Sequence, residues 1–166
     1  MRIVDPFIAE LDQENQTTER LLARVPDAKM SWKPHAKSLS LGQMAMHVAT
    51  IPGAVATFLA NDTFELGGVP RPEAKSAQEL TAALQESVAA AKKYLAGVDD
   101  NKALATWKMT IGGNVVMEAP RMAMIRGLML NHWIHHRGQL SVYLRLLDVP
   151  LPPFYGPTAD ENPFAR

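Results

Sequence analysis

The sequence predicts an all-α fold: a four-helix bundle with a short hairpin before the last helix and an extended, proline-rich C-terminal tail. Four segments repeat apolar side chains at the helical period, and each is long enough, at about 20 residues or more, to form a bundle helix. The chain of 166 residues fits one domain, residues 1–166, with a substantial core. Long connections around the second helix leave the order of the helices in the bundle open.

The first predicted helix covers about residues 5–25. Asp5 suits the N-cap, and Pro6 suits the first helical position because its missing N–H has no partner there in any case. Pro26 ends the helix. Apolar residues follow the helical period between these signals, so one face is expected to be buried.

The second predicted helix covers about residues 40–59 and begins with a capping-box pattern at Ser40. Pro52 lies inside it and predicts a kink, because proline removes one backbone hydrogen bond and crowds the preceding turn. The stretch 41–60 has the length of a membrane span. It also carries glutamine, histidine, threonine and proline, so we interpret it as a buried bundle helix.

The third and fourth predicted helices cover about residues 76–95 and 120–147. The third begins with another capping-box pattern, and Gly97 is suited to end it. Pro120 opens the fourth helix, and Pro150 follows its end.

Two stretches break the helical pattern. In residues 107–117, β-branched side chains flank Gly112, Gly113 and Asn114, which predicts a short hairpin. The tail from residue 150 onward is too rich in proline for a helix and is expected to lie extended over the bundle.

Composition excludes several kinds of function. Seventeen basic and seventeen acidic residues balance, which argues against a nucleic-acid partner and against an electrostatic membrane anchor. The sequence contains no cysteine, so disulfides, cysteine-based zinc sites and thiol nucleophiles are absent. No signal-peptide pattern occurs at the N-terminus, and we expect a cytoplasmic protein.

Two histidines stand at metal-ligand spacing in the fourth predicted helix. His132 and His136 are four residues apart, which places both rings on one helix face. Apolar residues share that face, so it is expected to point into the bundle. One helix offers two imidazoles to one metal ion in this way.

His47 lies on the apolar face of the second predicted helix and is the candidate third ligand. Three neutral imidazoles suit zinc, nickel, iron or copper and leave positions open for water or substrate. The alternative is structural, because a single histidine on an apolar face is more often a hydrogen-bonded core residue than a ligand.

Other polar residues of the fourth helix have competing interpretations. His135 lies at the edge of the inward face and is a surface residue, a base beside the ligands or a rival ligand, with the surface position favoured. Gln139, one turn beyond His136, either orients a ligand imidazole or satisfies a buried carbonyl. Arg137 is expected to point away from the site, to solvent or a partner subunit, and His35 is expected to be a solvated loop residue.

Three segments resemble the DinB/YfiT-like metalloprotein superfamily. The most specific is the string NHWIHHRGQ at residues 131–139. The stretch from Trp32-Lys33-Pro34 through Ser40 to His47 resembles that family's segment ahead of its second helix. The tail at residues 155–162 is similar to a YGPSADE-like ending, with Thr158 in place of the usual serine.

The resemblance spans residues 32–162 and implies a four-helix bundle that holds one metal ion. Carried over by position, the ligands are His47, His132 and His136, and His135 is excluded. Related members include transferases and isomerases that use low-molecular-weight thiols, and members are commonly dimeric. The DNA polymerase that shares the name is unrelated.

We therefore expect a metal-dependent enzyme that acts on a small molecule by thiol transfer or hydrolysis, with a divalent ion of zinc, nickel or iron. The alternative is a non-catalytic metal-binding protein with a stress-response or interaction role. No acidic residue lies on the inward faces of the second or fourth helix, so a general base is missing there. The tail residues Tyr155, Asp160 and Glu161 could cover the site.

The fourth helix is also apolar outside its histidine face. Four apolar residues lie there: Leu130, Trp133, Ile134 and Leu144. Because a second apolar face on a bundle helix often marks a subunit interface, we predict a homodimer.

Overall fold

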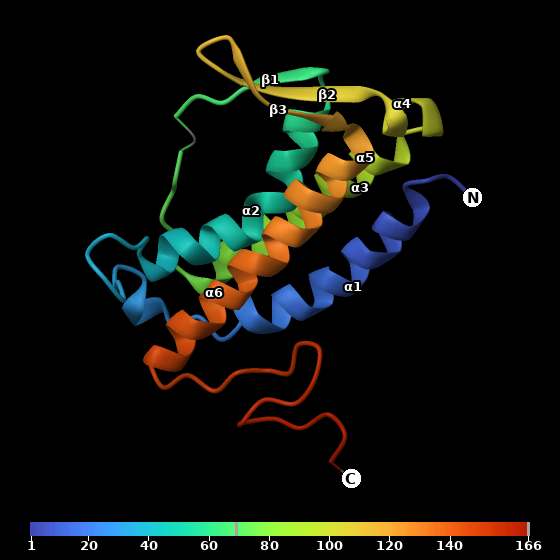
Figure 1. Cartoon of the computed structure of the whole chain (residues 1–166). Helices are drawn as coiled ribbons and strands as arrows, with labels where there is room; N and C mark the ends of the chain where they lie inside the picture. The colour runs from blue at the N-terminus through green and yellow to red at the C-terminus, as the bar shows by residue number, and fades with distance from the viewer. Residues whose placement is uncertain (69, 166) are drawn as a thin grey trace.

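The computed structural model describes residues 1–68 and 70–165. Four long helical stretches run through the molecule (Figure 1), as the sequence predicts. The first three are single α-helices, and the last consists of three consecutive segments. Their bounds are α1 (Asp5–Leu22), α2 (Leu41–Leu59), α3 (Ala77–Ala96) and then α5 (Arg121–Met124), η2 (Ile125–Asn131) and α6 (His132–Leu146).

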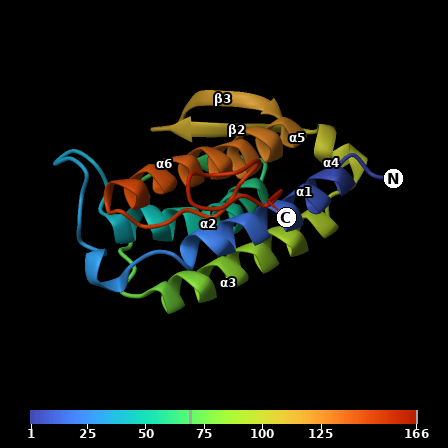
Figure 2. The same cartoon turned by 90° about the horizontal axis from the view of Figure 1, so that it is seen from below.

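The core lies between these stretches. α2 packs against α3 and α6, and α1 packs against both α3 and α6. Figure 2, which views the molecule from below, shows α1 and α3 side by side beneath α2 and α6. η2 and α6 therefore have helices on two sides, and this decides how much of their surface is buried.

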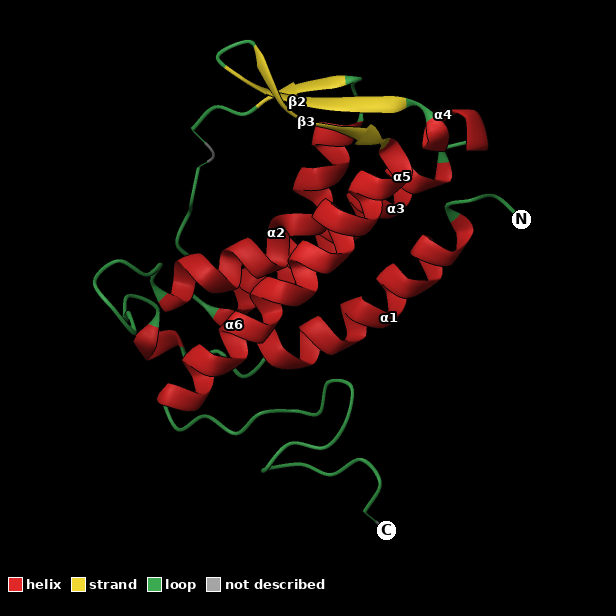
Figure 3. Ribbon diagram, viewed as in Figure 1, coloured by secondary structure: helices red, strands yellow, loops and turns green. Residues whose placement is uncertain are grey.

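Capping and close packing set the position of α2. The side chain of Ser40 accepts a hydrogen bond from the backbone N–H of Gln43, and the Gln43 side chain accepts one from the N–H of Ser40. Pro52 lies inside the helix, and Figure 3 shows the helix axis bending along its length. At the next residue, a Cβ on Gly53 would lie 2.8 Å from the Cα of Ser87. The absence of a side chain at Gly53 therefore allows α2 and α3 to approach closely.

A three-stranded sheet covers one end of the bundle (Figure 3). The predicted hairpin is present as β2 (Thr106–Ile111) and β3 (Asn114–Pro120), joined through Gly112 and Gly113 at φ values of 56° and 78°. Positive φ at both turn positions is what a type I′ hairpin requires. The sequence analysis missed β1 (Thr63–Glu65), which pairs in parallel with β2.

Two short helices also lie outside the predictions, η1 (Asp27–Lys29) and α4 (Asp100–Leu104). The first helix begins at Asp5, as predicted, but Val4 occupies the N-cap position. The Asp5 carboxylate instead accepts a hydrogen bond from the backbone N–H of Arg2, at 2.7 Å. The capping role that we predicted for Asp5 is therefore wrong.

The start of the last helical stretch is fastened to the end of α2. Arg121 is almost fully buried, and its guanidinium donates to the carbonyls of Leu59 and Asn61 and to the carboxylate of Asp62. Carbonyls at a helix C-terminus have no partner within the helix, so this arginine satisfies them from outside. The seven-residue π-helical segment η2 follows directly, which the sequence did not reveal.

Residues 150–165 of the C-terminal tail form no helix, as predicted, and cross the bundle in the view from below (Figure 2). The tail is held by side chains of α1 and α6: Tyr155 by Glu14 and Arg137, and Asp160 by Arg145. Arg137 corrects a prediction, because it is 2 % exposed and does not reach solvent. Its guanidinium forms a 2.5 Å ion pair with Glu14.

The surface predicted for dimerisation is part of the core. Leu130, Trp133 and Leu144 are each 0 % exposed within the single chain, and the indole N–H of Trp133 donates to the carbonyl of Val48. The argument from these residues is therefore wrong, while dimerisation itself stays a prediction. In the part of the chain that the structure describes, no helix combines the length and the apolarity needed to cross a membrane.

Candidate metal centre

Three histidines meet between α2 and α6. His47 comes from α2, and His132 and His136 come from consecutive turns of α6, so the four-residue spacing places both rings on the face toward α2. One ring nitrogen from each lies within 4.8 Å of the other two. The Nε2 atoms of His132 and His136 are 2.8 Å apart. The structure thus brings together the three residues that the sequence singled out.

Neighbouring groups act on two of the rings. Nδ1 of His136 lies 2.7 Å from Oε1 of Gln139, an acceptor, so this nitrogen carries the proton and Nε2 presents its lone pair. The backbone of Leu128, which lies in the π-helical segment, acts on the ring of His132 and raises its pKa against the larger, lowering effect of burial. π-helical turns often occur at functional sites because they change which backbone and side-chain groups face inward.

Burial keeps the three rings uncharged. Burial first, and then the neighbouring histidines and the charge of Arg71, together lower the pKa of His47 to about 4. Burial is also the largest cause of the lowered pKa values of His132 and His136. A metal ligand must offer an unprotonated nitrogen, so this environment favours the ligand form of all three imidazoles at neutral pH.

A cavity of about 330 Å³ opens beside the histidines. Its walls come from α2, β2, η2, α6 and the connections before α2 and after β1. Most of the lining is apolar, and the residues are Leu39, His47, Val55, Phe58, Leu66, Arg71, Met109, Leu128, His132 and His136. No described lining residue carries a carboxylate.

The donor set fits a transition metal. Each of the three imidazoles provides one nitrogen, and the nitrogens converge from two helices onto one point beside the cavity. Three protein nitrogens with open space beside them match the ligand count of catalytic zinc sites, where the fourth position is left for water or substrate. The 2.8 Å approach of two Nε2 atoms is close for two lone pairs, and a shared cation would offset their repulsion.

Several candidate residues lie outside this group. His135 is exposed, as favoured from the sequence, although its ring centroid is 5.1 Å from that of His136. His35 is also exposed. The suggestion that Tyr155 and the acidic residues of the tail cover the site is wrong, because Tyr155 binds Glu14 and Arg137 on the side of α6 that packs against α1.

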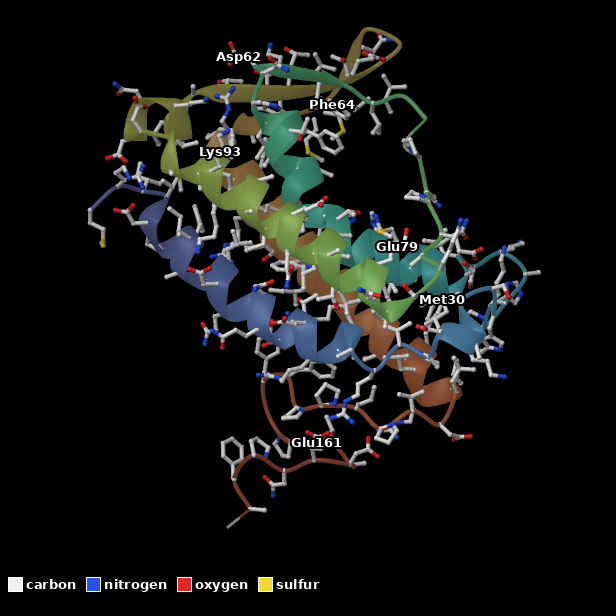
Figure 4. All side chains as sticks on the ribbon, turned by 180° about the vertical axis from the view of Figure 1, so that it is seen from behind. Met30, Asp62, Phe64, Glu79, Lys93 and Glu161 are labelled. Carbon is white, nitrogen blue, oxygen red and sulfur yellow. The ribbon has the colours of Figure 1, made fainter. Side chains whose placement is uncertain are left out.

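The acidic tail residues have partners elsewhere too. Asp160 pairs with Arg145, and Glu161, labelled on the tail in Figure 4, pairs with Arg24 at 2.6 Å. Sequence reasoning also missed one cavity residue, Arg71. The only signal was its place between Pro70 and Pro72, which marks an extended segment but not what that segment faces.

Comparison with known proteins agrees with this architecture. An uncharacterized protein of Bacillus subtilis strain 168, YrdA, is 25% identical over 158 residues, which cover 95% of this chain and 91% of YrdA. A DinB-like protein from Bacillus cereus has a TM-score of 0.72 at 20% identity, over 92% of this chain and 97% of that one.

A second DinB-like structure, YjoA from Bacillus subtilis, has a TM-score of 0.68 at 18% identity, over 91% of this chain and 97% of that one. These two likenesses concern the fold. The model of the DinB family matches residues 3–163, nearly the whole sequence. The chain therefore belongs to the DinB family.

Proposed function

We propose that His47, His132 and His136 hold one divalent transition-metal ion, zinc, nickel or iron. The observation that carries this proposal is the convergence of three neutral imidazole nitrogens within 4.8 Å at the edge of a cavity.

With this ion bound, the protein acts as a metal-dependent enzyme on a small molecule, either by thiol transfer or by hydrolysis. A metal ion held there would supply Lewis acidity, which lowers the pKa of a thiol or water and makes it a nucleophile at neutral pH. The chain has no cysteine, so the attacking sulfur in a thiol transfer comes from a cosubstrate. Gln139 keeps the lone pair of His136 Nε2 directed at the ion.

A non-catalytic role is the second candidate, and one observation favours it. Among the described residues that line the cavity, none is an aspartate or glutamate. A hydrolase of this kind ordinarily has a carboxylate or a free histidine as general base. Metal-dependent binding, in a stress-response or interaction role, requires no such group.

Metal analysis of purified variants tests the first part of the proposal. His47→Ala, His132→Ala and His136→Ala should each lose most of the bound metal, because two imidazoles hold the ion far more weakly than three. His135→Ala is the matched control, since it removes an exposed imidazole from the same helix, and it should keep about one ion per chain. Equal loss in His135→Ala would contradict the ligand assignment.

A cobalt-substituted sample separates the enzymatic and binding roles. Low-molecular-weight thiols such as bacillithiol, mycothiol and glutathione are added while the absorption spectrum is recorded. A sulfur-to-metal charge-transfer band that is absent in His132→Ala would support thiol chemistry. A spectrum that is unchanged by all three thiols would rule out the thiol-transferase hypothesis. Turnover assays with hydrolysable esters and amides would then decide between hydrolysis and binding.

A further inference from the structure

The cavity beside the histidines carries charge of one sign only. Six of its described lining residues are apolar, three are histidines, and the tenth, Arg71, is the one that carries a permanent charge. The cavity thus combines an apolar wall with a single guanidinium and no counter-ion.

The guanidinium of Arg71 has no partner among residues 1–68 and 70–165. The structure gives it no ion pair and no side-chain hydrogen bond, and only its backbone carbonyl accepts one, from Gln43. Every other arginine in the described part of the chain donates at least one side-chain hydrogen bond: Arg2, Arg20, Arg24, Arg121, Arg126, Arg137 and Arg145. Arg71 is thus the described arginine whose guanidinium N–H groups have no acceptor among the described residues.

The backbone holds Arg71 at the cavity. Pro70 and Pro72 flank it, which restricts the segment to extended conformations. The next two residues are fastened to the start of α2: Glu73 hydrogen-bonds Ser40, and the N–H of Ala74 donates to the carbonyl of Gly42. A Cβ on Gly42 would come within 2.8 Å of the Ala74 carbonyl oxygen, so the contact is tight. Arg71 is therefore attached to the same helix that carries His47.

The charge balance of the loaded site favours an anion. Three neutral imidazoles leave the charge of a divalent ion uncompensated, and Arg71 adds a further positive charge. Arg71 is exposed and the three histidines are half-buried, so an anion that binds between them would compensate both positive charges. A planar guanidinium binds carboxylates and related oxyanions through two parallel hydrogen bonds.

We propose that Arg71 selects the substrate, and that this substrate is a small amphipathic anion. Its oxyanion group, of the carboxylate type, binds Arg71, and its apolar body packs against the walls formed by residues such as Phe58, Met109 and Leu128. Its reacting atom faces His47, His132 and His136. The orientation of the reacting atom rests on the proposed function, whereas the contact with Arg71 does not require a metal ion.

Matched probes test the proposal on the cobalt-substituted protein. A series of ω-mercaptocarboxylates of increasing length is compared with the uncharged ω-mercaptoalcohols of the same lengths, with the charge-transfer band as readout. At its best length, the carboxylate should bind roughly tenfold more tightly than the alcohol, in the range of an exposed charge-assisted hydrogen bond. The preference should shrink as salt is added.

Two arginine variants and one control complete the experiment. Arg71→Ala should abolish the preference for the carboxylate while leaving the affinity for the alcohol unchanged, and Arg71→Lys should keep part of the preference. Lys93→Ala removes the same charge from the exposed face of α3 (Figure 4), which does not line the cavity, and should behave as wild type. An undiminished preference in Arg71→Ala, or no preference in the wild type, would overturn the proposal.

A metal-free arm separates this proposal from the proposed function. Alkanoates and alkanols without a thiol are titrated into metal-free protein, and NMR signals of the cavity residues are followed. The wild type should prefer the alkanoate and Arg71→Ala should not. If this result were obtained while no thiol gave a cobalt charge-transfer band, thiol chemistry would be ruled out and the Arg71 contact would still be supported. A charge-transfer band for the thiols without any Arg71-dependent preference would support thiol chemistry and overturn the proposed contact with Arg71.

Discussion

His136 and Arg137 are adjacent in α6, yet they face different neighbouring helices and belong to two polar regions of different character. His136 faces α2 and joins His47 and His132 beside an open cavity. Arg137 faces α1, where its guanidinium binds the Glu14 carboxylate, the hydroxyl of Thr18 and the hydroxyl of Tyr155. Both regions are polar and lie largely within the bundle.

The two regions differ in how completely their polar groups are paired within the chain. In the Arg137 network, positive and negative charges pair within the chain, and the tail completes the network through Tyr155. In the histidine cluster, the Nε2 atoms of His132 and His136 lie 2.8 Å apart and border an open cavity, where a ligand can reach them. Buried polar groups are nearly always paired in folded proteins. A closed network therefore indicates a structural role, and an open one indicates a site that a ligand completes.

Breaking the closed network should give the largest loss of stability. Arg137→Met leaves the Glu14 carboxylate buried without its cation, and the free energy of unfolding should fall by about 3–5 kcal/mol. Denaturant unfolding of the metal-free protein measures the change. The double variant Glu14→Leu/Arg137→Met removes both charges and should be more stable than Arg137→Met alone. A double variant as unstable as the sum of both single changes would mean that the two residues do not act as a pair.

Gln139→Ala sharpens the comparison from the other side. The amide orients the His136 ring, and loss of such a partner typically weakens metal binding by roughly 10- to 100-fold. The free energy of unfolding of the metal-free protein should change by less than about 0.5 kcal/mol, because Gln139 is only partly buried. Calorimetric zinc titration measures the affinity, with His135→Ala as control. Unchanged affinity in Gln139→Ala would show that the ring is held by packing alone.

Tyr155→Phe should have a smaller effect, confined to the closed network. The hydroxyl donates to Glu14 at 2.9 Å and accepts from Arg137 at 2.6 Å. Because the side chain is largely exposed, its loss should cost about 1 kcal/mol or less. Thermal unfolding gives the stability, and limited proteolysis reports release of the tail. Metal content should not change, and a metal-depleted Tyr155→Phe protein would contradict the separation of the two regions.

The smallest effect concerns the Arg145–Asp160 pair at the edge of the closed network. Hydrogen bonds from Arg145 and from the backbone N–H of Leu151 lower the pKa of Asp160 below 3.8. A carboxylate with a lowered pKa stabilises the fold above its unfolded pKa, and this contribution is lost as the pH falls through the folded pKa. Asp160→Asn should therefore lower the melting temperature slightly at neutral pH, and the difference should begin to shrink near pH 4 and disappear as the pH falls through the lowered pKa of Asp160. A difference that persists at pH 2 would contradict this assignment.

The site could be predicted from the sequence because two of its residues are local to one helix. The spacing of His132 and His136 fixes their common face without any knowledge of the fold, and His47 followed from the apolar face of its own helix. Arg71 was missed because an irregular connection has no period from which its direction can be inferred. Its position depends on contacts with α2 that are distant in sequence.

The errors on the last helix have one physical cause. The sequence analysis treated the histidine face as the buried side and everything else as surface, which placed Arg137 in solvent and Trp133 at a dimer interface. In the structure α6 is covered by α2 on one side and by α1 on another, so both residues are core. β1 was missed for a related reason, because three residues gain strand geometry only by pairing with β2, more than 40 residues further along the chain.

The π-helical segment Ile125–Asn131 adjusts the rotation of the last helix between two places where that helix must face α2. Upstream, Arg121 locks the helix to the end of α2, and downstream the histidines must face the same α2 from a different turn. Each residue advances an α-helix by about 100°. Winding the same residues as an α-helix instead would rotate the whole downstream helix by about that angle, carrying the imidazoles out of register with His47. The π-helical winding thus lets one helix satisfy two angular requirements.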